Sequence, residues 1–287
     1  MIKCDKTNVI LFDSMGIGNR IFTLFSCLRF FSTESFNLYW PTEGWVTDRF
    51  SNLFNFHWDY PILEIDGAVS RGDVSIPYPL DVSLSSLYVD KKEIFLNTPL
   101  KNIHTYRPFS MLLRYEGTPR RAIRLFESYF ERLHPNPNVV KRVEEVDIPA
   151  DFIFLQIRNN ADWENERGGN RNIPLERYFE LIDRSFSDRS IYLCAMNKGV
   201  SSAVRNRYGD RVFELPNKNY MSMIDAVADL YIGAKSTCFV VDGESTFSQL
   251  SWWLGGCRAR VVLLHAKPNI LKNIKRNIRR NHLLNWL

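Results

Sequence analysis

The sequence predicts an α/β fold with two Rossmann-like domains, and three observations support this. The second half alternates short apolar stretches with amphipathic stretches of roughly 10–14 residues, the pattern of strands joined by helices in a parallel sheet. A run rich in proline and asparagine, HPNPNVVKRVEEVDIP at 134–149, separates this half from the first. The length of 287 residues also allows two modest domains, although it would fit one large domain as well. We therefore expect domains at 1–148 and 149–287.

The first half predicts fewer regular elements than the second. NVILF at 8–12 predicts a buried strand, and the apolar run from 19 to about 32 predicts a helix. Between 33 and 110, short aromatic stretches alternate with turn signals, which indicates several short strands joined by long loops. Apolar residues at helical spacing predict a helix over 120–133.

The second half predicts five strands in a parallel sheet. We expect strands at 151–157, 189–195, 237–243 and 258–265 with a short one at 211–216, and helices at 173–186, 199–209, 221–234 and 245–256. The last segment, 267–287, predicts an amphipathic helix packed on the body. Its basic face leaves contact with nucleic acid or a membrane surface open as an alternative.

Composition indicates an ordinary globular protein of a reducing compartment. A net charge of +5 is compatible with a phosphate-bearing ligand but is a weak signal for nucleic acid, which we do not expect as a partner. The five cysteines are scattered and show no zinc-ligand spacing. The N-terminus lacks a secretory signal, and no apolar run reaches the roughly 18–20 residues that span a bilayer. We expect a cytoplasmic protein, of a bacterium or of a virus-infected host.

A glycine-containing turn follows the first predicted strand. The turn runs through Asp13 to Gly16, Ile17 and Gly18 and leads into a helix. Free backbone N–H groups at a helix start attract anions, and glycine lets a ligand approach the backbone closely. The third glycine of a dinucleotide fingerprint and the Lys-Ser/Thr of a P-loop are both missing. On the residues alone, a structural turn is the first interpretation.

An arginine follows the first strand of the second half directly. Arg158 stands at the carboxyl end of the strand 151–157, where a guanidinium suits bidentate contact with a phosphate. The alternative is a strand-end arginine paired with a nearby carboxylate. The charged, glycine-rich stretch 163–174 that follows predicts a mobile loop over the site.

Two further groups lie on the same predicted sheet. Ser245 and Thr246 follow the strand 237–243 and open a helix, where such residues are most often N-caps but also suit a phosphate. Asp225 and Asp229 are four residues apart and share a helical face. No third acidic ligand is spaced to complete a metal site, so we expect none.

Taken in order, these motifs resemble the fucosyltransferase superfamily, which includes α-1,2-, α-1,6- and protein O-fucosyltransferases. GIGNR after a strand is similar to its N-terminal signature, and FLQIRNNAD, IDAVADLYIGAKST and VVDGESTFSQLSWWLGG are similar to later motifs. The match covers residues 8–32 and about 150–256. The resemblance implies a GT-B-type fold whose two domains face a cleft, the first binding the acceptor and the second a nucleotide sugar. It also implies an inverting enzyme that uses GDP-fucose without a metal or other cofactor.

The resemblance also implies roles for individual residues. Arg158 would grip the donor diphosphate, Asp229 would accept from the nucleotide base, and Asn197 would lie near the ribose or base. The other donor-binding candidates are Gly16, Gly18, Asn19 and Arg20 from the first domain and Gln156, Glu244, Ser245 and Thr246 from the second. Asp13 and Asp162 are the candidates for a general base.

Departures from the family pattern leave the donor open. Gln156 stands where the family has a histidine, Asn159 replaces a second arginine, and Asp162 matches the acidic residue only after a one-residue slip. We expect a transferase of fucose from a GDP-sugar to a glycan hydroxyl. The alternatives are a transferase of xylose or another sugar from UDP or GDP, and a non-enzymatic glycan- or polyanion-binding relative.

Overall fold

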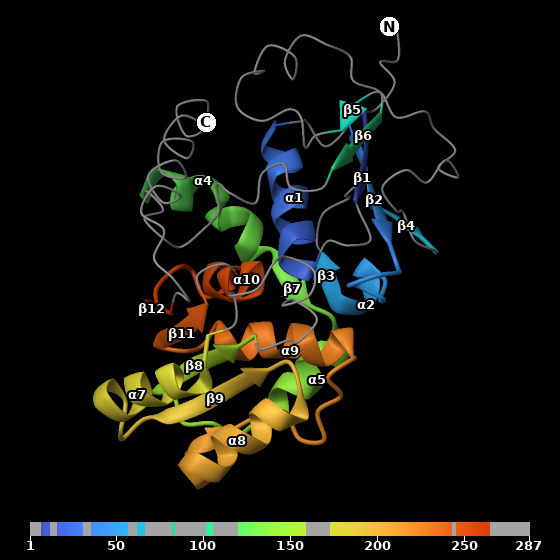
Figure 1. Cartoon of the computed structure of the whole chain (residues 1–287). Helices are drawn as coiled ribbons and strands as arrows, with labels where there is room; N and C mark the ends of the chain where they lie inside the picture. The colour runs from blue at the N-terminus through green and yellow to red at the C-terminus, as the bar shows by residue number, and fades with distance from the viewer. Residues whose placement is uncertain are drawn as a thin grey trace, which may run out of the picture. The chain divides into compact units, whose positions relative to one another are not determined.

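A computed structural model describes residues 7–11, 16–30, 36–56, 62–66, 82–83, 102–105, 120–158, 173–242 and 245–264. Contacts divide the chain into two compact units, with the boundary between His134 and Pro135. Each unit contains a five-stranded sheet in which every neighbouring pair is parallel (Figure 1). The predicted α/β class with Rossmann-like halves is confirmed.

The sheet of unit 1 has the strand order β4-β2-β1-β6-β5. Its strands are β1 (Thr7–Leu11), β2 (Phe36–Pro41), β4 (Ile62–Ile65), β5 (Val82–Ser83) and β6 (Asn102–Thr105). The central strand β1 pairs with β2 on one side and with β6 on the other. The helix that starts at Ile17, next in the chain after β1, therefore follows the strand at which the order reverses.

The helices of unit 1 are α1 (Ile17–Phe30), α2 (Phe50–Leu53) and α4 (Arg120–Glu131), and aromatic side chains join α1 to α4. Phe25 of α1 meets Phe130 of α4 edge to face, with 4.7 Å between ring centroids, and stacks on Tyr129 at 5.7 Å. A separate two-stranded sheet joins β3 (Phe54–Phe56) and β7 (Leu133–Pro135), at whose end the chain enters unit 2.

The sheet of unit 2 has the strand order β10-β9-β8-β11-β12. Its strands are β8 (Phe152–Ile157), β9 (Ser190–Ala195), β10 (Val212–Phe213), β11 (Cys238–Asp242) and β12 (Arg260–Leu264), as the sequence predicted within a few residues. In chain order this is 3-2-1-4-5, the arrangement of a dinucleotide-binding half. Ligands of such sheets bind beyond the carboxyl ends of the two strands where the order reverses, here β8 and β11.

Helices cover both faces of this sheet (Figure 1). They are α5 (Pro137–Glu144), α7 (Leu175–Ser185), α8 (Lys198–Tyr208), α9 (Met223–Gly233) and α10 (Thr246–Leu254), with a short 3-10 turn η2 (Gly209–Arg211). Ile182 of α7 and Val204 of α8 belong to the same core cluster as Leu155 of β8. On the other face, a Cβ on Gly233 of α9 would lie 2.7 Å from the ring of Phe154. The helices on this face are thus packed closely against the sheet.

The segment at 134–149 differs from the linker we expected. It contains α5, and Asn136 caps this helix by accepting from the backbone N–H of Asn138 at 3.0 Å, with Pro137 in the first turn. The prolines and asparagines that suggested a break are therefore helix-start signals. The contact boundary at His134 and Pro135 precedes the expected one at 148–149.

Several expectations fall outside the described residues. The predicted C-terminal helix at 267–287 and nearly all of the predicted loop at 163–174 lie there. Among the described helices, none has both the length and the apolar character required to cross a membrane.

Candidate functional site

The carboxyl ends of β8 and β11 place two of the predicted phosphate-suited elements on one edge. Arg158 follows Ile157, the last residue of β8, and is half-buried. Ser245 occupies the N-cap position of α10, and Thr246 is its first residue. Because β8 and β11 are parallel neighbours, in register at Leu155 and Val240, these ends meet at the same edge of the sheet. The sheet topology therefore supports the predicted grouping.

The N-terminus of α10 is not capped by the side chain of its N-cap residue. Ser245 has the extended backbone of an N-cap but makes no capping hydrogen bond. By contrast, Asn197 caps α8 by accepting from Val200 N at 3.0 Å, and Ser222 caps α9 by accepting from Asp225 N at 3.2 Å. The first N–H groups of a helix have no partner within the helix and carry its positive end. The start of α10 is suited to an anion.

Buried polar atoms without a hydrogen-bond partner concentrate at this edge. Of six such atoms among the described residues, four belong to Gln156, Ser245 and Gln249. Gln156 is 4% exposed, and Ser245 and Gln249 are fully buried. An unpartnered buried polar group costs about 1–3 kcal/mol, so these groups are candidates for contact with a ligand.

Gln249 is a candidate site residue that the sequence reasoning missed. It lies four residues after Ser245 and therefore on the same face of α10. Neither its amide oxygen nor its amide nitrogen has a partner. The spacing from Ser245 was the available signal, although a glutamine on a helix is far more often a surface residue.

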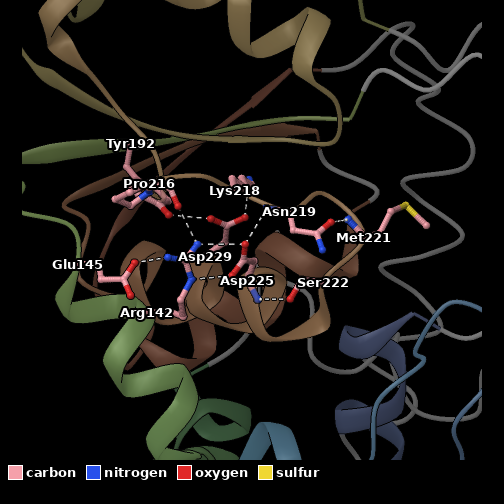
Figure 2. A network of polar contacts seen from close by, with 10 residues as sticks. All are labelled: Arg142, Glu145, Tyr192, Pro216, Lys218, Asn219, Met221, Ser222, Asp225 and Asp229. Carbon is pink, nitrogen blue, oxygen red and sulfur yellow. Dashed lines mark hydrogen bonds and ion pairs between the residues drawn. The ribbon is translucent and has the colours of Figure 1, made fainter.

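Asp229 lies in a buried cluster rather than at an open edge (Figure 2). Its Oδ1 accepts from the Tyr192 hydroxyl at 2.7 Å, and its Oδ2 lies 2.8 Å from Lys218 Nζ. Burial and the nearby Asp229 charge raise the pKa values of Tyr192 and Cys194. Burial by itself would lower the pKa of Lys218, but the charge of Asp229, its hydrogen bond and the other nearby acidic groups together outweigh burial, and the pKa rises. The cluster is a neutralised ion pair in which Tyr192 and Cys194 keep their protons.

Arg20 is fully buried in unit 1. Its Nη1 donates to the carbonyl oxygen of Pro41 and its Nη2 to that of Glu43 at 3.4 Å, while the guanidinium lies 5.1 Å from the centroid of the Trp40 ring. These contacts tie the first turn of α1 to the segment after β2. The structure thus gives Arg20 a supporting role within unit 1.

The glycine-containing turn is described only from Gly16 onward. The backbone N–H of Arg20 donates to the Gly16 carbonyl at 3.2 Å, and α1 includes Gly18 and Asn19 in its first turn. A Cβ on Gly16 would meet no atom within 4 Å. Packing against the rest of the protein therefore does not require a glycine at 16.

Three predicted residues, Asp13, Asp162 and Glu244, lie outside the described part of the chain. Within the part that is described, no group of three or more His, Cys, Asp or Glu side chains is placed to hold a metal ion. Asp225 and Asp229, which share a face of α9 as expected, are instead paired with Arg142 and Lys218.

Comparison with solved structures identifies the fold. One similar structure is NodZ, a fucosyltransferase from Bradyrhizobium. The structure of the NodZ α-1,6-fucosyltransferase co-crystallised with GDP matches with a TM-score of 0.54 at 17% identity, over 86% of this chain and 92% of that one. FUT1 of Arabidopsis thaliana, a variant in complex with GDP, matches with a TM-score of 0.54 at 14% identity, over 93% and 72%. POFUT1 in its apo form matches with a TM-score of 0.52 at 9% identity, over 92% and 99%.

These similarities show that the chain has the fold of GT-B fucosyltransferases. The resemblance predicted from the motifs is thereby confirmed at the level of the fold. No protein-family model matches the chain, and no curated protein matches it by sequence.

Proposed function

We propose that this protein is an inverting glycosyltransferase that transfers a sugar, with fucose as the first candidate, from a GDP-sugar to a glycan hydroxyl. One observation carries the proposal: among the described residues, four of the six buried side-chain atoms without a partner belong to Gln156 near the end of β8, two residues before Arg158, and to Ser245 and Gln249 in the first turn of α10. A cation, helix-start N–H groups, a hydroxyl and an amide together suit a diphosphate. The fold neighbours that contain GDP support the choice of nucleotide.

The proposed reaction is a single displacement at the anomeric carbon. The acceptor oxygen bonds to C1 from the face opposite the diphosphate, and the bond from C1 to the phosphate oxygen breaks with its electron pair leaving on GDP. The acceptor proton passes to a general base, for which Asp13 and Asp162 are our candidates. Arg158 and the start of α10, with Ser245 and Thr246, stabilise the charge that develops on the departing diphosphate.

The other donor contacts are proposed from the resemblance. Gly16, Gly18 and Asn19 would meet the sugar end of the donor from unit 1, and the open space beside Gly16 supports a close approach of the backbone. Asn197 would lie near the ribose. Its Oδ1 caps α8, so its amide nitrogen is the group that we propose for this contact.

We further propose that transfer needs no metal ion. Arg158 and the positive end of α10 supply the charge compensation that a divalent cation gives to other transferases. Transfer should therefore be equally fast with and without EDTA. A loss of rate in EDTA that Mg²⁺ or Mn²⁺ restores would contradict this part of the proposal.

A thermal-shift panel with GDP, UDP, GDP-fucose and UDP-xylose tests the donor. Only a ligand that binds the native state raises the midpoint, so the GDP ligands should raise it most. Arg158→Ala should abolish the shift. Arg189→Ala is the matched control, because Arg189 precedes β9 at the opposite edge of the sheet and pairs with Asp151 at 3.0 Å. No shift with any nucleotide would refute the transferase assignment.

A second candidate keeps the enzyme class and changes the donor. Gln156 and Asn159 differ from the family pattern beside the proposed diphosphate site, and they favour testing xylose and other sugars on UDP. A larger shift with UDP ligands would select this candidate. Binding of a polyanion that weakens steeply with salt, without any nucleotide shift, would instead select the non-enzymatic relative.

A further inference from the structure

Two carboxylates on α9 each pair with a cation from a different element (Figure 2). Asp225 pairs with Arg142 of α5: Arg142 Nε donates to Asp225 Oδ1 at 2.8 Å, and Arg142 Nη2 donates to Asp225 Oδ2 at 3.1 Å. Asp229 receives Lys218, which lies in the segment between β10 and α9, at 2.8 Å. The hydrogen bond to Asp225 raises the pKa of Arg142, so the guanidinium stays charged. We call Pro216–Met221, the segment around Lys218, the 216–221 segment.

The 216–221 segment is fixed at three points. Arg142 Nη2 donates to the Pro216 carbonyl at 3.0 Å, and the Asn219 backbone N–H donates to Asp225 Oδ2 at 2.8 Å. Between these points, the Lys218 ammonium is buried against Asp229. The segment is thus held by α5, by α9 and by its own lysine.

The lysine also joins the segment to the sheet. Lys218 Nζ donates to the carbonyl of Ala195, the last residue of β9, at 3.3 Å. Asp229, which is 2% exposed, accepts in addition from Tyr192 and Cys194 of the same strand. The 216–221 segment is therefore anchored at the carboxyl edge of the sheet, the edge that carries Arg158.

A buried ion pair is weak evidence for a role in stability. Removing two charges from water costs most of what their attraction returns, and apolar residues of the same volume often stabilise as well or better. The side chains of Lys218 and Asp229 are 7% and 3% exposed, so this cost applies in full. What such a pair supplies is a defined position, in this molecule the position of the 216–221 segment.

The segment presents an aromatic and an apolar side chain at that edge. Tyr220 is half-buried and its ring centroid lies 5.3 Å from Lys218 Nζ, while Met221 is 86% exposed. An aromatic ring on a fixed segment, followed in the chain by an exposed methionine, is suited to stacking against a flat heterocycle. The nucleobase is the flat part of the proposed donor.

We propose that the 216–221 segment is the nucleobase wall of the donor site and that Lys218 is its positioning residue. Asp229 then acts through Lys218, because both of its oxygens already accept from donors within the protein. This replaces the role of base acceptor that the resemblance implied for Asp229. The inference rests on the proposed donor site and names the part of it that selects the base.

Calorimetry with GDP and inorganic pyrophosphate tests the inference, because pyrophosphate lacks the base. Tyr220→Ala leaves both ion pairs intact and should weaken GDP binding about tenfold, the effect of losing one stacked base, with pyrophosphate binding unchanged. Lys218→Met should weaken GDP binding at least as much, again without an effect on pyrophosphate. Lys235→Met, an exposed lysine just after α9, is the control and should change neither.

Lys218→Met leaves Asp229 buried without its cation and can unfold the unit, so the double variant Lys218→Met, Asp229→Asn accompanies it. That variant should fold and still bind GDP weakly, because the segment has lost its anchor. GDP binding at the wild-type level in both Tyr220→Ala and the double variant would overturn the inference alone. A wild-type protein that binds pyrophosphate but not GDP would also overturn it, and one that binds neither would overturn the proposed function as well.

Discussion

Replacing Gln249 by methionine should stabilise the unliganded protein and weaken donor binding. Methionine has nearly the shape of glutamine and carries no amide. Gln249 is fully buried, and both of its polar side-chain atoms lack a partner. An unpartnered buried group costs about 1–3 kcal/mol, so Gln249→Met should raise the free energy of unfolding by about that amount. The thermal midpoint should rise by about 2–4 °C for each kcal/mol.

The same substitution, Gln249→Met, should weaken the binding of the ligand. In the proposed site the Gln249 amide hydrogen-bonds the charged diphosphate, and a bond to a charged group contributes about 1.5–3 kcal/mol. Losing it should raise the Kd for GDP by about 10- to 150-fold. A more stable protein that binds its ligand less well is the signature of a group kept for function.

Ser251→Ala is the matched control on the same helix. Ser251 is also fully buried, but its hydroxyl donates to the Leu230 carbonyl at 2.7 Å. Its removal should lower the free energy of unfolding by about 0.5–1.5 kcal/mol and leave the Kd for GDP unchanged. Thermal unfolding without ligand and calorimetry with GDP measure both effects. If Gln249→Met lowered the midpoint as Ser251→Ala does and kept wild-type affinity, the assignment of Gln249 to the donor site would be refuted.

Three further predictions concern the turn, the helix packing and the buried acids. Gly16→Ala should leave the thermal midpoint within about 1 °C of the wild-type value, since a Cβ there meets no atom within 4 Å. The same variant should weaken the binding of GDP-fucose. An unchanged Kd would mean that the turn has a purely structural role. Gly233→Ala would bring a Cβ to 2.5 Å from Ser251 Oγ and should lower the free energy of unfolding by about 1–3 kcal/mol. Gly199→Ala should not destabilise the protein, because its Cβ meets only Asn197 Oδ1 at 3.4 Å. Equal urea midpoints for the two variants would contradict this prediction. Burial raises the pKa of Cys194 above its ordinary value of 9.0 and that of Tyr192 above 10.0. The stability that these protonated groups give the folded state is present below pH 9 and lost as the pH rises. Urea midpoints should therefore fall between about pH 9 and 11, and they should fall by less in Tyr192→Phe.

Sequence patterns predicted unit 2 better than unit 1, for a physical reason. A central strand of a parallel sheet is buried on both faces and so appears as a nearly continuous apolar run, as in FIFLQI of β8, where every residue is buried. In unit 1 the run NVILF predicted β1 in the same way, but the other strands of that unit carry no such signal. β5 has two residues, and its place in the sheet depends on pairing with β6 rather than on local composition.

The candidate site was predictable in its chemistry but not in its contacts. Arg158 and Arg20 both belong to motifs that suggested phosphate, yet Arg20 is buried against carbonyls 21 and 23 residues further along the chain. The spacing of Asp225 and Asp229 predicted a shared helical face. Their partners Arg142 and Lys218 come from other elements, and no local pattern identifies a partner 83 residues away.

Unpartnered groups on α10 persist because that helix cannot easily turn to relieve them. Ser251 bonds the Leu230 carbonyl of α9, and at Gly233 the backbone of α9 approaches both Ser251 and the Phe154 ring so closely that a Cβ would not fit. Rotating α10 to give Gln249 a partner would break this contact between helix, helix and sheet. The free energy of close packing thus offsets the cost of leaving Gln249 and Ser245 unpaired. The closely packed side of α10 thus faces α9, and its unpartnered groups belong to the first turn, where we propose that the diphosphate binds.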